Sequence, residues 1–296
     1  MSSVVSVVER LPVVVGVDGM PADLQVVDVA AEEAAVRGVP LHVVHAWPGR
    51  QVMWSRHRGA ADQLDGRHLL ELAIRRAQLA YPSLIVGTQL VDEGAAEALV
   101  RWSARAGLLV VRHRDEGGLG HGWGSTAAYV AHHSVCPLLV HRGASTPRGP
   151  VVVAVSGRRT ASLRCAFESA ARAGSGLTAV HVKETGGMVE AHLDEVLAEW
   201  GALWPEVPVE RLSVGEDEVP YTIDRASRRC RLLVAGRGRK GWSVEAVYNS
   251  GGMASGGRQL CPVLLVPPGW PVGGRMSAGV SEAGRMSAGI SEAGRY

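Results

Sequence analysis

The sequence predicts an α/β protein made of two tandem, doubly wound domains, each built around a five-stranded parallel sheet. Short runs of valine, leucine and isoleucine alternate with segments rich in alanine, leucine, glutamate and arginine. This alternation is typical of parallel strands that are covered on both faces by helices. The same order of segments occurs again in the second half of the chain, which predicts two copies of one fold.

The repeat rests on four pairs of matching segments that come in the same order in both halves. In chain order the pairs are PVVVGVDGMPADLQ (12–25) with PVVVAVSGRRTASL (150–163), AAEEAAVRGVPLHVVHAW (30–47) with AFESAARAGSGLTAVHVK (166–183), AGLLVVR (106–112) with CRLLVAG (230–236), and CPLLV (136–140) with CPVLLV (261–266).

The strands are predicted from short apolar runs, which suit strands buried on both faces. In the first half these runs lie at 12–18, 41–47, 84–91, 107–112 and 137–141. Helices are predicted between them, near 21–38, 62–80, 94–106 and 124–134. In the second half the strands are predicted near 150–156, 177–183, 207–214, 231–236 and 262–266.

We divide the chain into an N-terminal leader (1–10), a first domain (11–142), a linker (143–149), a second domain (150–267) and a tail (268–296). The tail repeats GRMSAG-[VI]-SEA with a period of ten and is rich in glycine and serine. It lacks the apolar stripe of a helix and is predicted to be flexible. A repeated interaction motif is the alternative.

Composition and charge exclude several classes of protein. The net charge of +2 argues against a nucleic-acid binder, which normally carries a basic face. No apolar run reaches the roughly 18 residues of a membrane helix, and the first residues do not form a signal peptide. The four cysteines, at 136, 165, 230 and 261, show no metal-binding spacing. We therefore expect a cytoplasmic protein without a membrane segment, whose cysteines are small buried hydrophobes.

These residues resemble the universal stress protein family in its tandem two-domain form. The resemblance covers residues 11–267 and rests on VVVGVDG, EEAAVRG-x-PLHVVHAW, LLVV, GST and HHSVCPLLV taken together. It implies a small regulatory protein of the stress response, because family members are regulatory and some of them bind ATP. Members usually pair through the last strand, so we expect the two domains to pair within the chain. A homodimer and an unidentified regulatory protein partner stay open.

The resemblance also implies a nucleotide site in the first domain, at Asp18, Val44, Gly124, Ser125 and Thr126. Binding members carry an Asp after strand one and G-x-x-G-x9-G-[ST] after strand four. Glycines allow backbone N–H groups to approach phosphate, and the helix that follows favours the anion at its N-terminus.

The glycine pair of this signature is missing here, since Arg112 and Asp115 stand at its two positions. Two interpretations of Arg112 stay open: it contacts phosphate, or its side chain fills the phosphate subsite and excludes the ligand.

The second domain departs from the signature elsewhere. It keeps Gly236 and Gly238 and adds the cations Arg237, Arg239 and Lys240, which suit a phosphate loop. However, Ser156 replaces the strand-one Asp, and Ser250 follows Asn249 where Gly-Ser is expected. The residues after 249 are rich in glycine, which weakens the helix whose N-terminus should hold the anion. The expected ligand is therefore ATP with magnesium, bound weakly in the first domain, with Gly236, Gly238 and Ser250 as the alternative site.

No catalytic residues and no metal site are predicted. The loop SGRRTAS (156–162) lacks the glycine and aspartate of the ATP pyrophosphatase loop, and a G-x-S-x-G elbow is absent. The adjacent His132 and His133 point about 100° apart on a helix and have no further ligand at metal spacing. Two functions stay open: a regulatory nucleotide-binding protein, and a scaffold that binds no nucleotide and acts through protein contacts.

Overall fold

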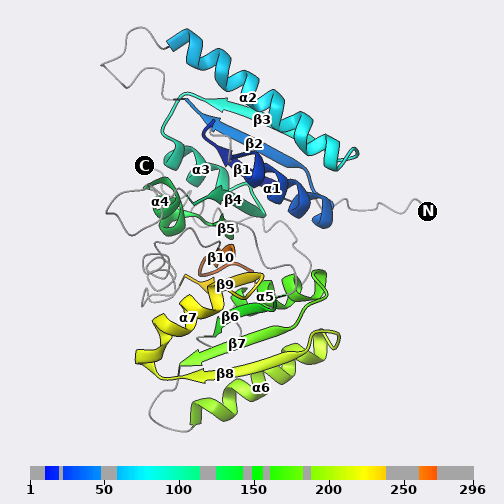
Figure 1. Ribbon diagram of the computed structural model, residues 1–296, viewed down its shortest axis with the longest axis vertical. Coiled ribbons are helices and arrows are strands. Elements are labelled where there is room, and N and C mark those ends of the chain that lie inside the picture. The colour runs from blue at the N-terminus through cyan, green and yellow to red at the C-terminus, as the bar shows by residue number, and fades with distance from the viewer. Residues whose placement is uncertain are drawn as a thin grey trace, which may run out of the picture.

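The computed structural model describes residues 11–19, 23–47, 59–113, 125–142, 149–155, 161–182, 188–237 and 260–271. In these residues ten strands form one continuous sheet, with helices packed on both of its faces (Figure 1). No helix in this part of the chain is long and apolar enough to cross a membrane.

The first domain alternates strands and helices as the sequence predicts. Its strands are short and mostly buried because both faces of the sheet are covered. Its elements are β1 (Val13–Val17), α1 (Asp23–Arg37), β2 (Leu41–Ala46), α2 (Gly59–Ala80), β3 (Val86–Val91), α3 (Ala95–Ser103), β4 (Leu108–Arg112), α4 (Ser125–His133) and β5 (Leu138–His141).

The second domain repeats this order up to its fourth strand. Its elements are β6 (Val151–Val155), α5 (Ala161–Arg172), β7 (Leu177–Val182), α6 (Met188–Leu203), β8 (Val209–Val214), a short 3₁₀ turn (Glu216–Glu218), α7 (Val219–Ser227), β9 (Leu232–Gly236) and β10 (Val263–Val266). The glycine-rich segment predicted to be a short or broken helix, 249–260, lies outside the described residues except for Leu260.

Matching glycines end the first helix of each domain. Gly38 follows α1 with φ 63°, and Gly174 follows α5 with φ 56°. A positive φ closes a helix and costs glycine little, because glycine has no Cβ. The two positions align in the sequence repeat, so both crossovers turn back toward the sheet in the same way.

The strand order is β3-β2-β1-β4-β5-β10-β9-β6-β7-β8. Within each domain neighbouring strands are parallel, whereas β5 and β10 pair antiparallel across the domain boundary, with Leu139 opposite Leu264. The predicted meeting of the two last strands is therefore confirmed. The pairing covers two apolar edges that would otherwise invite aggregation.

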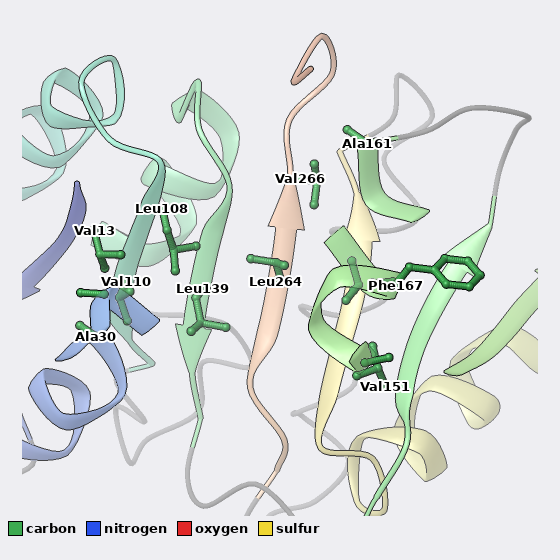
Figure 2. Close-up of a cluster of buried hydrophobic side chains, with 14 of the residues drawn as sticks. Val13, Ala30, Leu108, Val110, Leu139, Val151, Ala161, Phe167, Leu264 and Val266 are labelled. Atoms are coloured by element: carbon green, nitrogen blue, oxygen red, sulfur yellow. The ribbon is translucent and has the colours of Figure 1, made fainter. Parts of the chain in front are cut away.

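Each face of the sheet has its own hydrophobic cluster, because side chains alternate along a strand. One cluster contains Val13, from β1, and Phe167, from α5, and runs across the boundary through Leu139 and Leu264 (Figure 2). The other cluster contains Val14 together with residues of α3, α4 and α7. The two domains thus share one continuous core on each face.

Part of the predicted tail belongs to the folded body. Trp270 is partly buried and packs against both hydrophobic clusters, and the Pro271 carbonyl accepts a bond of 3.4 Å from Arg164 Nη1. A large indole gains enough apolar burial to offset the entropy of ordering the short segment that carries it. The body therefore extends beyond the predicted boundary at residue 268.

Deleting residues 272–296 should change the melting temperature by less than about 1 °C, because a segment poor in large apolar groups buries little area. Trp270→Ala is the matched comparison and should lower the melting temperature by several degrees, because its ring contacts both clusters. Thermal unfolding followed by circular dichroism measures both. A loss of several degrees on deletion would mean that the deleted residues dock on the body.

Candidate functional site

The first domain carries its candidate site where β1 and β4 lie side by side. The order β3-β2-β1-β4-β5 reverses direction between these two strands, and ligands of such sheets bind beyond the carboxyl ends of the strands at this point. Asp18 follows β1 directly, and Arg112 is the last residue of β4. The parallel register pairs Val15 with Val110, so the two charged residues reach the same edge.

Asp18 and Arg112 form an ion pair at that edge. Arg112 Nη2 lies 3.5 Å from Asp18 Oδ2, and the side chains are 20% and 37% exposed for Arg112 and Asp18, respectively. Arg112 stands at the first glycine position of the expected phosphate loop. The Arg112 side chain is therefore paired with the Asp18 carboxylate, the group that a magnesium ion at this edge would need.

His141 flanks the same pair from β5. It lies opposite Arg112 in the β4–β5 register and is buried. Burial and then the positive charge of Arg112 lower the pKa of His141. His141 is consequently neutral at neutral pH and adds no positive charge beside Arg112.

His45 fixes the end of β1 from the neighbouring strand. Its Nδ1 lies 2.9 Å from the Val17 carbonyl oxygen, directly before Asp18. A Cβ on Gly66 of α2 would come within 2.9 Å of the His45 ring, so the glycine lets the ring lie under the helix. His181 makes the matching contact with Val155 O at 3.5 Å. His45 and His181 were not predicted as site residues, although they occupy equivalent positions in the sequence repeat.

The other predicted residues of the first site are only partly brought together. Val44 lies inside β2, opposite Gly16, and its side chain is buried in the core. Ser125 is the first residue of α4, and Thr126 follows it in a half-buried position. The predicted start of a helix at this position is thus present. Gly124 and Asp115 lie outside the described residues.

The alternative site in the second domain is described only at Gly236, which ends β9. A Cβ at Gly236 would lie 3.5 Å from Ser162 Oγ, so the strand end and the start of α5 are close. Gly238, Ser250 and Ser156 lie outside the described residues.

Arg237 contradicts the interpretation of the loop after β9 as a cluster of phosphate-binding cations. Its Nη1 donates to the carbonyls of Ala131 and Ser134, at 3.1 and 2.9 Å, at the end of α4 in the first domain. Carbonyls at a helix end lack intrahelical partners and attract a cation. Burial lowers the pKa of Arg237. This arginine therefore joins the two domains and does not face a ligand of its own domain.

Metal coordination by the protein alone finds no support in the described part of the chain, where no group of three His, Cys, Asp or Glu side chains is placed to hold an ion. Asp18 offers a single carboxylate. A cation at this edge would need further ligands from water or from a bound phosphate.

Comparisons with known proteins agree with this architecture. A model of the universal stress protein family matches residues 10–142. Universal stress protein Rv2623 of Mycobacterium tuberculosis is 30% identical over 276 residues, which cover 81% of this chain and 91% of that protein. Universal stress protein Mb2028c of Mycobacterium bovis is 29% identical over 261 residues, with 77% and 88% covered.

Solved structures show the same fold over nearly the whole length. The crystal structure of a universal stress protein from Archaeoglobus fulgidus superposes with a TM-score of 0.66, at 14% identity, and covers 87% of this chain and 96% of that chain. Another, of a putative universal stress protein from Pseudomonas aeruginosa, gives a TM-score of 0.55 at 15% identity, with 88% and 94% covered. The sequence resemblance is confirmed, and the chain belongs to the universal stress protein family.

Proposed function

We propose that this chain is a non-catalytic regulatory protein of the stress response whose first domain binds ATP weakly, with magnesium, in competition with the Asp18–Arg112 ion pair. The observation that carries the proposal is the position of this pair at the β1–β4 edge. The Asp18 carboxylate suits a magnesium ion, and the Arg112 guanidinium suits a phosphate. A candidate ligand for each part of a magnesium nucleotide therefore lies at this edge of the sheet.

The ion pair weakens binding without preventing it. Both side chains are partly exposed, and such pairs contribute about 0–1 kcal/mol. Breaking the pair would thus cost at most about fivefold in affinity. The larger loss comes from the missing glycines of the signature, because glycine lets backbone N–H groups approach a phosphate more closely than a residue with a side chain does.

The start of α4 supports the phosphate end of this proposal. The helix begins at Ser125, and its first N–H groups have no intrahelical acceptors. An anion at this end is favoured by these groups and by the helix dipole.

The second candidate function is a scaffold that binds no nucleotide. Arg237 favours it, because a cation of the second phosphate loop is used to join the domains. A protein of this kind would act through its surface and would keep the family fold for its shape alone.

Isothermal titration calorimetry with ATP and magnesium tests the first function. Asp18→Ala should weaken the affinity at least about tenfold, a change of about 1.4 kcal/mol. Ser125→Ala should also weaken it, and chelation of magnesium should act like Asp18→Ala. Lys240→Ala, in the second domain, is the control and should bind like the wild type.

Arg112→Gly separates the two interpretations of Arg112. If the arginine only blocks the subsite, the variant frees Asp18 and restores the first glycine, and it should raise the affinity by more than the roughly fivefold that the ion pair costs. If the arginine contacts phosphate, the variant should bind more weakly. Absence of heat with the wild type and with Arg112→Gly would favour the scaffold. A loss confined to Lys240→Ala would move the site to the second domain.

A further inference from the structure

A half-buried arginine crosses the boundary between the domains. Arg142 directly follows β5, and the antiparallel register of β5 with β10 places it opposite Cys261. Its Nε donates to the Cys261 carbonyl at 3.0 Å, and its Nη2 donates to Ser227 Oγ at 3.4 Å. The same Nη2 lies 4.0 Å from Cys261 Sγ. The guanidinium of the first domain is thus held against a cysteine of the second.

The charge of Arg142 has no carboxylate partner among the described residues. The ion pairs found there do not include it, and its Nη1 is buried without a hydrogen-bond partner. The ionisable groups that act on it are the thiols of Cys261 and Cys230. A cation that is largely removed from water is unfavourable without a compensating charge, and arginine does not lose its proton to relieve the cost. Among the described residues, the thiols of Cys261 and Cys230 are the acids placed to supply that charge.

Cys230 and Cys261 are placed to share that role. Both are buried, and their sulfur atoms lie 3.0 Å apart. Cys230 precedes β9 and Cys261 precedes β10, and these neighbouring parallel strands pair Leu233 with Val263. If this register continues, Cys261 lies opposite Arg231, the neighbour of Cys230. The Cα atoms of the two cysteines are then roughly 5.8 Å apart. This separation lies in the usual range for a disulfide.

We propose that Cys261 is a thiolate paired with Arg142, and that Cys230 and Cys261 form a redox site which a peroxide oxidises to a disulfide. The hydrogen bond from the Cys230 thiol and then the charge of Arg142 lower the pKa of Cys261 against the effect of burial. The same hydrogen bond, together with burial, raises the pKa of Cys230. Cys261 is the attacking sulfur, and Cys230 is the resolving thiol.

The reaction balances with hydrogen peroxide as the only co-reactant. The Cys261 thiolate attacks one peroxide oxygen, the O–O bond breaks, and the second oxygen leaves as hydroxide, which takes a proton from solvent. The Cys230 sulfur then attacks the sulfenic acid, the S–O bond breaks, and the departing oxygen leaves as water with the Cys230 proton. Two thiols lose two electrons, and one peroxide becomes two waters.

The first domain provides an internal comparison. The repeat places Ala106 where the second domain has Cys230, and Cys136 where it has Cys261. The β5–β10 register places Pro267 opposite Cys136, whereas it places Arg142 opposite Cys261. Burial raises the pKa of Cys136 to about 12. Cys261 therefore has both a second thiol beside it and an arginine opposite it, whereas its counterpart Cys136 has neither at the matching positions.

Burial of both thiols restricts the oxidant to small molecules. Cys230 is 1% and Cys261 is 2% exposed. Hydrogen peroxide is close to water in size, whereas oxidised glutathione cannot reach a buried sulfur atom. The site should therefore respond to peroxide and not to a disulfide oxidant.

The test is peroxide treatment of the folded, reduced, full-length protein, followed by intact mass and peptide mapping without reduction. The expected result is a loss of the mass of two hydrogen atoms and a cross-link between the peptides that contain Cys230 and Cys261. Cys230→Ser and Cys261→Ser should abolish the cross-link. Cys136→Ser is the matched control and should keep it. Oxidised glutathione should leave the mass unchanged.

Arg142→Gln tests the role of the charge. It should slow the peroxide reaction about tenfold, as expected when the thiolate fraction falls by that factor. If this variant does not fold, the ultraviolet absorbance of a thiolate in the reduced wild type serves instead: Cys261→Ser should remove it and Cys136→Ser should not. A folded protein that resists excess peroxide, a cross-link that involves Cys136 or Cys165, or equal rates with and without Arg142 would overturn the proposal.

Discussion

Replacing Phe167 with alanine is expected to lower the free energy of unfolding by about 3–5 kcal/mol, as for other fully buried aromatic side chains. Phe167 lies on α5 with no exposed surface and is the chain's one phenylalanine. Its ring stacks against those of Trp200 and Trp204, at centroid distances of 6.0 and 5.6 Å, and the two indoles also stack on each other. Removing it leaves a cavity between α5 and α6 that neither indole can fill by a simple shift.

Urea unfolding followed by tryptophan fluorescence measures this effect, because two of the neighbours are fluorescent. Tyr221→Ala is the control: its side chain is 66% exposed, and its removal should change stability by less than about 0.5 kcal/mol. Equal losses for the two variants would show that the aromatic cluster is not a principal support of the second domain.

Gly149→Ala should be the second most damaging of these changes, with a loss of about 1–3 kcal/mol or more. A Cβ at this buried position would overlap the Arg229 carbonyl oxygen and lie 3.0 Å from Arg231 N. These are backbone atoms, and Arg231 N is already held by the Pro150 carbonyl at 2.9 Å. The chain cannot retreat without breaking the entry into β6.

Gly201→Ala provides the matched control because the same methyl group is added in open space. Gly201 lies in α6, where a Cβ would meet nothing within 4 Å. Alanine favours a helix over glycine by about 1 kcal/mol, so this variant should be more stable than the wild type. Thermal and urea unfolding of both variants should give shifts of opposite sign. A neutral Gly149→Ala would mean that the 229–231 backbone can move aside.

The fold could be predicted from the sequence because its signals are local and repeated. Each strand is a short apolar run, and the second half repeats the pattern of the first. The pairing of β5 with β10 was implied by the family resemblance, and the apolar character of both strands supports it, because an unpaired apolar edge would invite aggregation. The end of the second domain was misplaced because the tryptophan at 270 is a single apolar residue among turn-forming ones.

The candidate site was predicted less completely. Asp18 and Arg112 align with positions of the family signature, so both could be placed at the candidate site, but their ion pair was not predicted. The partner of Arg237 was not predicted either, because it lies 103–106 residues earlier in the chain and depends on how the domains pack. The contact of Arg142 with Cys261 likewise depends on the β5–β10 register, which no local pattern encodes.

The antiparallel pairing of β5 with β10 forms a seam between the two domains of one chain. In a dimer of identical subunits every contact at such a seam would occur twice, and the seam would separate on dilution. Here the two sides are always present one to one, at an effective concentration set by the connection between them, roughly millimolar for a short linker. Each side therefore meets a partner that differs from itself, so Arg142 can face Cys261 while Pro267 faces Cys136. Tandem fusion makes the seam independent of the amount of protein in the cell and lets its two halves specialise.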